Sequence, residues 1–157
     1  MLSPESLAKI DYELTKYPAD RRQAAVMSAL RIAQTEKGWL SKETITFVAD
    51  YLGIPPIAAL EVATFYNMYD LEPVGKYKIT VCTNISCMLR DADQIVDHLQ
   101  CKLGIGFNET TPNGKFTLKE GECMGACGGA PLFHVNNTKM HESLTPAKVD
   151  EILEGLK

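Results

Sequence analysis

This chain of 157 residues lacks several features that would assign it to large functional classes. No apolar run approaches the ~20 residues that a membrane-spanning helix needs, so no direct membrane insertion is expected. Positive charge is not in excess, since 16 Lys and Arg face 20 Asp and Glu, and this balance does not favour nucleic acid as a partner. The first residues show no basic segment followed by an apolar one, as a secretory signal would. We therefore expect a cytoplasmic location, where thiols stay reduced.

Several kinds of catalytic and binding site also find no support in the sequence. No Ser-His-Asp order or pair of carboxylates stands out, and a C-x-x-C motif for thiol exchange is absent. His98, His134 and His141 show no metal-ligand spacing, so we expect them to be packed or solvated. The segment 44–66 is similar to a helix-turn-helix, but 57–61 offers no Arg, Lys, Asn or Gln that would contact DNA bases. Hydrolysis and DNA binding are thus disfavoured.

What the sequence does contain is a pair of cysteine motifs. Cys82 and Cys87 form a C-x4-C motif, and Cys123 and Cys127 form a C-x3-C motif after a gap of 35 residues. Four cysteines in two close pairs, in a reducing compartment, indicate metal or redox chemistry more than a disulfide framework. The fifth cysteine, Cys101, lies on the polar side of a predicted helix, and we expect it to be a free cysteine.

Spacing alone leaves the identity of the bound metal open. Four thiolates can complete a [2Fe–2S] cluster, and C-x4-C is part of the plant-type ferredoxin pattern. Structural zinc also uses four cysteines at such short spacings and is the second alternative, and disulfides are a third. Gly125, Gly128 and Gly129 favour a cluster, because backbone N–H groups without side chains can approach the sulfurs closely.

Residues 1–72 predict a helical bundle. Helix starts are expected at Ser3-Pro4, after Asp20 and after Ser41, and helix ends at Pro18, Gly38 and Gly53. A fourth helix after Pro56 carries the apolar residues Ile57, Leu60, Val62, Ala63, Phe65 and Tyr66. The apolar faces of these helices are small, so the bundle is expected to lean on something else.

Residues 73–157 predict a mixed sheet with helices, after a linker at 71–75. The expected order is β-α-β-β-β-α: a strand over 77–81, a helix over 91–103, a strand around Phe116 and Leu118, a hairpin over 132–141 and a helix after Thr145. The strand-helix-strand unit implies two parallel strands, and the hairpin adds an antiparallel edge. The fold class is therefore α+β, with two domains, 1–72 and 73–157.

Four sequence motifs carry a resemblance to a known family. They are E-V-A-T-F-Y at 61–66, V-C-T-N-I-S-C at 81–87, C-M-G-A-C-G-G-A-P at 123–131 and L-T-P at 144–146. Together the motifs resemble the E-subunit family of bacterial NADH–quinone oxidoreductase (respiratory complex I). Its mitochondrial counterpart and the small diaphorase subunits of NAD-linked hydrogenases and formate dehydrogenases belong to the same family.

This resemblance implies a thioredoxin-like ferredoxin domain with one [2Fe–2S] cluster on Cys82, Cys87, Cys123 and Cys127. It further implies an electron-transfer subunit of an NADH dehydrogenase, with no complete active site on this chain. FMN and NADH would be bound by a flavoprotein partner that contacts the N-terminal helices, beside other iron–sulfur subunits of the peripheral arm. The complex would lie on the cytoplasmic side of the inner membrane. The alternatives are the equivalent diaphorase subunit and a structural four-cysteine metal module.

Overall fold

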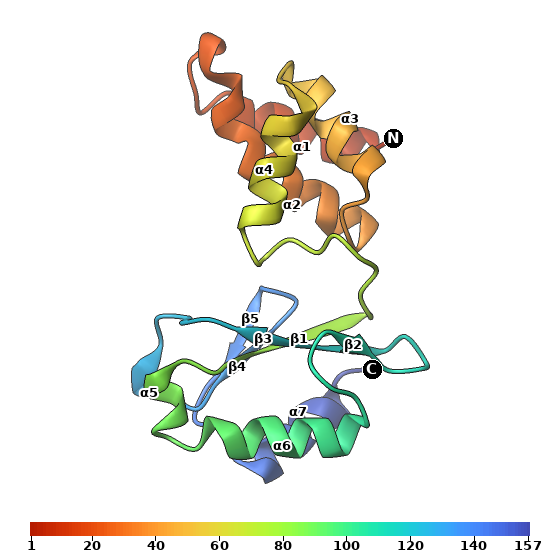
Figure 1. Cartoon of the computed structure of the whole chain (residues 1–157). Coiled ribbons are helices and arrows are strands. Elements are labelled where there is room, and N and C mark those ends of the chain that lie inside the picture. Colours follow the sequence, from red (N-terminus) through yellow and green to blue (C-terminus); the bar gives the residue numbers. More distant parts are fainter. The chain divides into compact units, whose positions relative to one another are not determined.

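A computed structural model describes all 157 residues, which form two compact units, Met1–Pro73 and Val74–Lys157 (Figure 1). The first is helical and the second contains a five-stranded sheet with helices. The predicted α+β class is confirmed. Each unit is described separately below, and the assignment of 1–72 and 73–157 as independent domains stays a prediction.

The N-terminal unit is a small helical bundle. Its helices are α1 (Pro4–Leu14), α2 (Val26–Lys37), α3 (Lys42–Leu52) and α4 (Pro56–Phe65). The Ser3 and Ser41 side chains cap α1 and α3 by accepting hydrogen bonds from backbone N–H groups, and Gly38 and Gly53 end α2 and α3 with positive φ, as the sequence predicts. A single apolar core joins the helices, with Ile10, Leu30, Val48, Leu52 and Ala63 among its buried members.

The start of the second helix was predicted wrongly. Asp20 does not cap α2, because Ala19–Ala25 form a 3-10 segment and α2 begins only at Val26. The guanidinium of Arg22 donates hydrogen bonds of 3.0 Å to the carbonyl oxygens of Tyr51 and Leu52 at the end of α3. These bonds satisfy carbonyls that α3 leaves without partners, and they hold this segment against α3 in a form that is not α-helical. The end of the first helix also differs from the prediction, because α1 ends at Leu14 and does not continue to Pro18.

Helix α4 leaves two of its large apolar side chains at the surface of this chain, whereas Leu60 and Val62 pack partly buried against the core. Only Ala59 and Ala63 are buried, whereas Ile57 is 60% exposed, Phe65 79% and Tyr66, just after the helix, 40%. A helix that is apolar on all sides normally packs on all sides. The expectation that the bundle leans on something else is consistent with this exposed surface.

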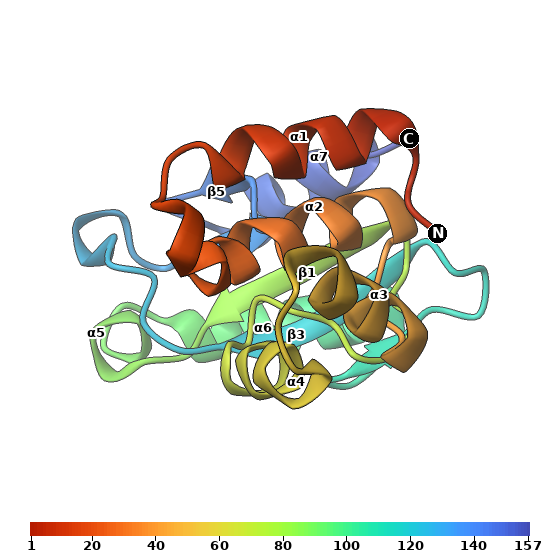
Figure 2. The same ribbon diagram turned by 90° about the horizontal axis from the view of Figure 1, so that it is seen from above.

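The C-terminal unit is built on a sheet of strand order β2-β3-β1-β4-β5, in which β1 and β3 run side by side (Figure 2). The strands are β1 (Tyr77–Cys82), β2 (Glu109–Thr110), β3 (Phe116–Gly121), β4 (Phe133–Val135) and β5 (Lys139–His141), and the helices are α5 (Ile85–Met88), α6 (Ala92–Leu103) and α7 (Pro146–Gly155). Strands β1 and β3 are parallel, with Cys82 opposite Gly121, and all other pairs are antiparallel. The predicted crossover and hairpin are therefore confirmed.

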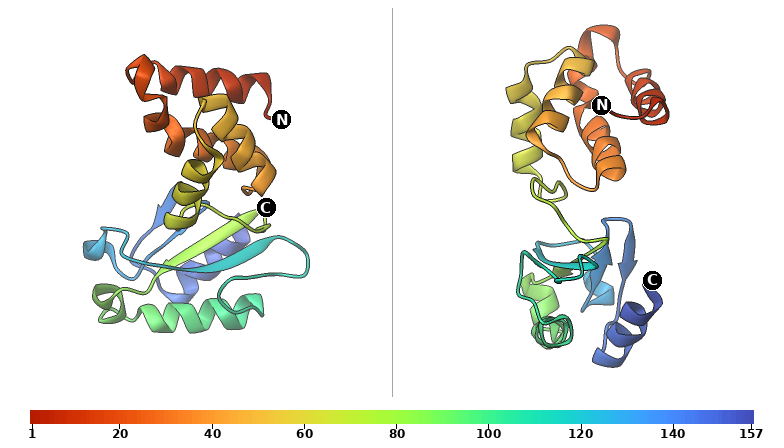
Figure 3. Two further views of the ribbon diagram at one scale, coloured as in Figure 1. Left: turned by 45° about the horizontal axis from the view of Figure 1, so that its top comes forward. Right: turned by 90° about the vertical axis from the view of Figure 1, so that its right-hand side faces the viewer.

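Helices α6 and α7 lie side by side against one face of this sheet (Figure 3). Ile79, Val81, Leu118 and Phe133 from the strands form a buried core with residues of α6 and α7 such as Leu99 and Val149. Helix α5 and strand β2 were not predicted, because a four-residue helix and a two-residue strand are too short to show a periodic pattern. Two loops leave this packed sheet at the same edge, after β1 and after β3.

Candidate metal centre

The four paired cysteines lie on two loops that follow neighbouring parallel strands. Cys82 is the last residue of β1, and Cys123 comes two residues after the end of β3 at Gly121. Because parallel strands point the same way, their carboxyl ends meet at one edge of the sheet, and the loops that follow begin side by side. The predicted strand-to-cysteine arrangement is thus present at both positions.

The first loop holds its cysteines in the interior. Cys82 and Cys87 are only 2% and 1% exposed. The short helix α5 turns Cys87 back toward the sheet, and its N–H donates a hydrogen bond of 2.8 Å to the Asn84 carbonyl oxygen. Both cysteines belong to a small buried cluster with Ala92, Ala130 and Leu132. This packing excludes water from one side of the site.

The second loop presents its cysteines at the surface. Cys123 and Cys127 are both exposed. The side chain of Met124, which follows Cys123, packs against the buried cluster that contains Cys82 and Cys87. The backbone N–H of Gly125 donates a hydrogen bond of 3.4 Å to the Sγ of Cys123. Gly125 has a φ of +72°, a conformation that residues with a side chain rarely adopt. The predicted contact between a glycine N–H and a sulfur is confirmed here.

Gly129 has a different role from the one predicted. Its N–H donates to the Ala126 carbonyl oxygen at 2.9 Å and closes a turn, so it does not approach a sulfur. A side chain at this position would collide with the carboxylate of Glu142. In addition, the Ser143 N–H donates a 2.6 Å hydrogen bond to the Gly129 carbonyl oxygen. Gly129 therefore allows the second loop to dock on the segment between β5 and α7. Gly128, by contrast, faces open space.

The sulfurs of both loops influence one another. The pKa of the Cys87 thiol is raised to about 12, chiefly by burial, then by its hydrogen bond with Cys82 and by the charges of Cys82, Cys127 and Cys123. Four thiolates in this space would repel one another unless a cationic group neutralised them. The chemistry of the donor set therefore suits a bound iron–sulfur or metal group.

The arrangement in two pairs matches a cluster of two irons. A [2Fe–2S] unit takes four cysteine thiolates, two on each iron. Its ligands need not converge on one point, and no three His, Cys, Asp or Glu side chains do so here. The fit to a dinuclear cluster rests on the number, type and pairing of the cysteines.

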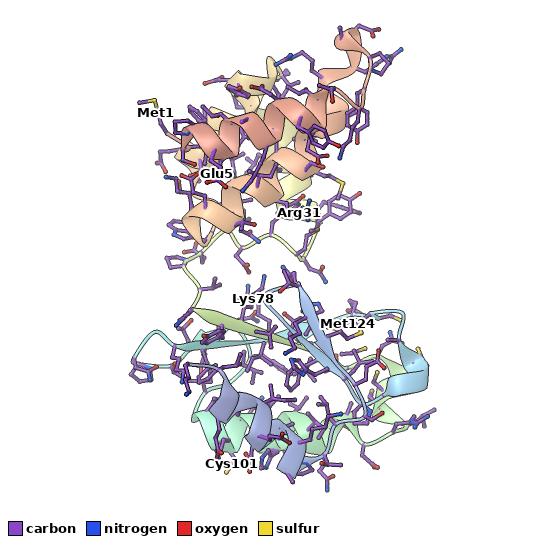
Figure 4. The ribbon with its side chains drawn as sticks, turned by 180° about the vertical axis from the view of Figure 1, so that it is seen from behind. Met1, Glu5, Arg31, Lys78, Cys101 and Met124 are labelled. Atoms are coloured by element: carbon purple, nitrogen blue, oxygen red, sulfur yellow. The ribbon has the colours of Figure 1, made fainter.

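The remaining candidates from the sequence lie elsewhere. Cys101 is exposed on the outer side of α6, away from Met124 and the cysteine loops (Figure 4). His98 pairs with Asp150 at 3.0 Å on the surface between α6 and α7. His134 and His141 sit in the β4–β5 hairpin, and burial lowers the pKa of each. None of the helices has the length and apolar character that crossing a bilayer requires.

Comparisons with known proteins identify the family. The model of the thioredoxin-like [2Fe-2S] ferredoxin family matches residues 10–157. NADH-quinone oxidoreductase subunit 2 of Thermus thermophilus is 39% identical over 148 residues, which cover 94% of this chain and 82% of that protein. The E subunit of the NADH-quinone oxidoreductase of Rickettsia typhi is 44% identical over 142 residues, covering 90% of this chain and 83% of that protein.

Two further proteins extend the comparison. The mitochondrial NADH dehydrogenase [ubiquinone] flavoprotein 2 of Dictyostelium discoideum is 41% identical over 154 residues, covering 98% of this chain and 62% of that protein. Among solved structures, an NAD+-reducing [NiFe]-hydrogenase in the H2-reduced state superposes with a TM-score of 0.69 over 81% of this chain. This chain spans 22% of that hydrogenase chain, and at 18% identity the match shows the fold alone.

These matches confirm the resemblance that the four motifs indicate, and with it the [2Fe–2S] cluster as the cofactor of the family. The relatives are named as subunits, so they work within larger assemblies. The chain belongs to the thioredoxin-like [2Fe–2S] ferredoxin family, among whose members are the E subunits of NADH-quinone oxidoreductase.

Proposed function

We propose that Cys82, Cys87, Cys123 and Cys127 hold one [2Fe–2S] cluster and that the chain is an electron-transfer subunit of an NADH-quinone oxidoreductase. The observation that carries this proposal is the position of two cysteine pairs on loops that follow the neighbouring parallel strands β1 and β3 at one edge of the sheet. When bound, a [2Fe–2S] cluster takes up and releases a single electron.

The residues of this chain would set the properties of that site. Burial of Cys82 and Cys87 keeps water from one pair of ligands, while Cys123 and Cys127 stay near solvent. The Gly125 N–H, aimed at the Cys123 sulfur, stabilises negative charge there. Hydrogen bonding and exposure are the main means by which a protein adjusts a cluster potential. The chain offers no nucleotide-binding motif, so its role is to carry electrons for a partner.

We further propose a flavoprotein that binds FMN and NADH as the direct partner, with the cluster next to the FMN and with other iron–sulfur subunits of the peripheral arm close by. The exposed apolar surface of α4, formed by Ile57, Phe65 and Tyr66, supports such a docking role for residues 1–72. Residues 73–157 would then act as the domain that carries the cluster. The proposed location is the cytoplasmic side of the inner membrane, within the complex.

Electron exchange with the flavoprotein tests this function. The purified chain, reduced and freed of reductant without oxygen, is mixed with the oxidised FMN flavoprotein. The expected result is loss of the electron paramagnetic resonance signal of the chain as the flavin absorbance bleaches, with one electron passing per chain. Phe65→Asp should slow this exchange by about tenfold or more, because docking surfaces depend on a few apolar anchors.

A matched control is Tyr12→Asp, which changes an exposed aromatic residue on α1 of the same unit and should leave the exchange unchanged. A chain whose signal persists beside the oxidised flavoprotein would contradict the electron-transfer role. A chain that binds the flavoprotein but contains only zinc would support the alternative of a structural metal module, because zinc cannot accept an electron.

A further inference from the structure

A side-chain hydrogen bond links the start of the first cysteine loop to the end of β3, from which the second loop leaves. The Thr83 hydroxyl, next to Cys82, donates to a carboxylate oxygen of Glu120 at 2.8 Å. Glu120 is the penultimate residue of β3, three positions before Cys123. The bond therefore joins the residue that follows the first ligand to the strand end that leads to the second loop.

The backbone reinforces this link at the same level. The Thr83 N–H donates a hydrogen bond of 3.2 Å to the Gly121 carbonyl oxygen. Thr83 directly follows Cys82, which forms the last residue pair between β1 and β3 with Gly121. Beyond that step the strands no longer pair, and each loop follows its own path. The distance between the loops is consequently set where Thr83, Glu120 and Gly121 meet.

We infer that Thr83 and Glu120 form a positioning pair that fixes the separation of the Cys82/Cys87 and Cys123/Cys127 pairs. This inference rests on the proposed role of the four cysteines as ligands of the cluster. A two-iron cluster is rigid, so its four sulfurs must be held at fixed separations. Loops that move apart would expose the metal–sulfur bonds to water and to competing ligands. The pair acts through the cysteines and does not itself coordinate iron.

Four substitutions separate the hydrogen bond from the charge of Glu120. Thr83→Val removes the donor and keeps nearly the same shape, whereas Thr83→Ser restores a hydroxyl. Glu120→Gln removes the charge but keeps a carbonyl oxygen that can accept the bond, whereas Glu120→Ala removes both. A matched control is Thr138→Val, because Thr138 donates its hydroxyl hydrogen to the Val135 carbonyl oxygen in the β4–β5 hairpin.

The experiment measures the rate at which an iron chelator removes iron from the full chain, and the resonance spectrum of the reduced protein. Thr83→Val and Glu120→Ala should each lose iron about fivefold faster than the wild type, the effect of one exposed hydrogen bond, with broadened or shifted g-values. Thr83→Ser, Glu120→Gln and Thr138→Val should stay near the wild-type rate. The Thr83 hydroxyl also lies 3.5 Å from the Gly121 carbonyl oxygen, a contact that Thr83→Val removes as well. The double variant Thr83→Val/Glu120→Ala should therefore be no faster than Thr83→Val alone, because the bond to Glu120 is lost only once.

Each outcome decides the inference. Wild-type rates and spectra in Thr83→Val and Glu120→Ala would overturn it, as would a Thr83→Ser variant as fast as Thr83→Val. Unfolding of both Thr83→Val and Glu120→Ala, seen by circular dichroism, would also overturn it by making the pair a requirement of the fold. A wild-type chain without iron and sulfide would instead refute the proposed ligands, so the two failures are distinct.

Discussion

Cys87→Ser should abolish the cluster, with iron falling from about two per chain to near zero. Cys87 is almost fully buried among the apolar side chains of Ala92, Ala130 and Leu132. A serine oxygen there is a poorer ligand for iron than thiolate sulfur, and an unpartnered hydroxyl in such a place costs about 1–3 kcal/mol. Iron, acid-labile sulfide and visible absorbance of the anaerobically purified variant measure the loss.

The control for this substitution is Cys101→Ser. Cys101 is exposed on α6 and far from the cysteine loops, so its replacement should leave the iron content and the spectrum unchanged. If Cys87→Ser kept a full and unaltered cluster, Cys87 would not be a ligand. If Cys101→Ser lost the cluster, the choice of the four ligands would be wrong.

Gly121→Val should both destabilise the C-terminal unit and lower its cluster content. A Cβ atom at Gly121 would lie 2.7 Å from the Thr80 methyl group and 2.7 Å from the Met124 methyl group, closer than such contacts occur. The carbonyl oxygen of Val81, at 3.3 Å, limits any relief by backbone movement. Overpacking of this kind costs about 1–3 kcal/mol. Strands β1 and β3 would have to part where the cysteine loops begin.

Thermal unfolding measures the first effect, and the expected fall in Tm is about 4–8 °C for each kcal/mol lost. Iron per folded chain measures the second. Gly155→Ala is the matched control, since no atom lies within 4 Å of its Cβ position at the end of α7. An unchanged Tm and iron content in Gly121→Val would mean that the strands can separate here without disturbing the site.

The sequence predicted the part of the fold that positions the cysteines. Alternation over 77–81 and around Phe116 located β1 and β3, and the helix between them required these strands to be parallel. Caps at Ser3, Ser41 and Thr145 were correct because the signal is local: a short polar side chain and the N–H three residues later.

The sequence failed where a distant contact decides the local structure. Asp20 has the character of a cap, but Arg22 binds carbonyls thirty positions away and holds its segment in a 3-10 form. Gly129 was predicted to bring its N–H close to a sulfur. In the structure a glycine is needed there because a side chain would collide with Glu142. Both contacts join residues that are distant in the sequence, so local sequence patterns could not predict them.

The candidate site was predicted only in outline. Spacing identified the two cysteine pairs but left iron and zinc open, and the family motifs supplied the choice of a [2Fe–2S] cluster. Spacing also gave no indication that Cys82 and Cys87 are buried while Cys123 and Cys127 are exposed. That difference arises from α5, too short to be predicted, and from the docking of the second loop near Ser143.

The most direct test of the account is a metal analysis joined to spectroscopy on the wild-type chain. Protein purified without oxygen is assayed for iron, acid-labile sulfide and zinc, and its electron paramagnetic resonance is recorded after reduction with dithionite. The account predicts about two irons and about two sulfides per chain, with one spin-half signal of rhombic or axial shape. One zinc per chain and no signal, even after reconstitution with iron and sulfide, would contradict it.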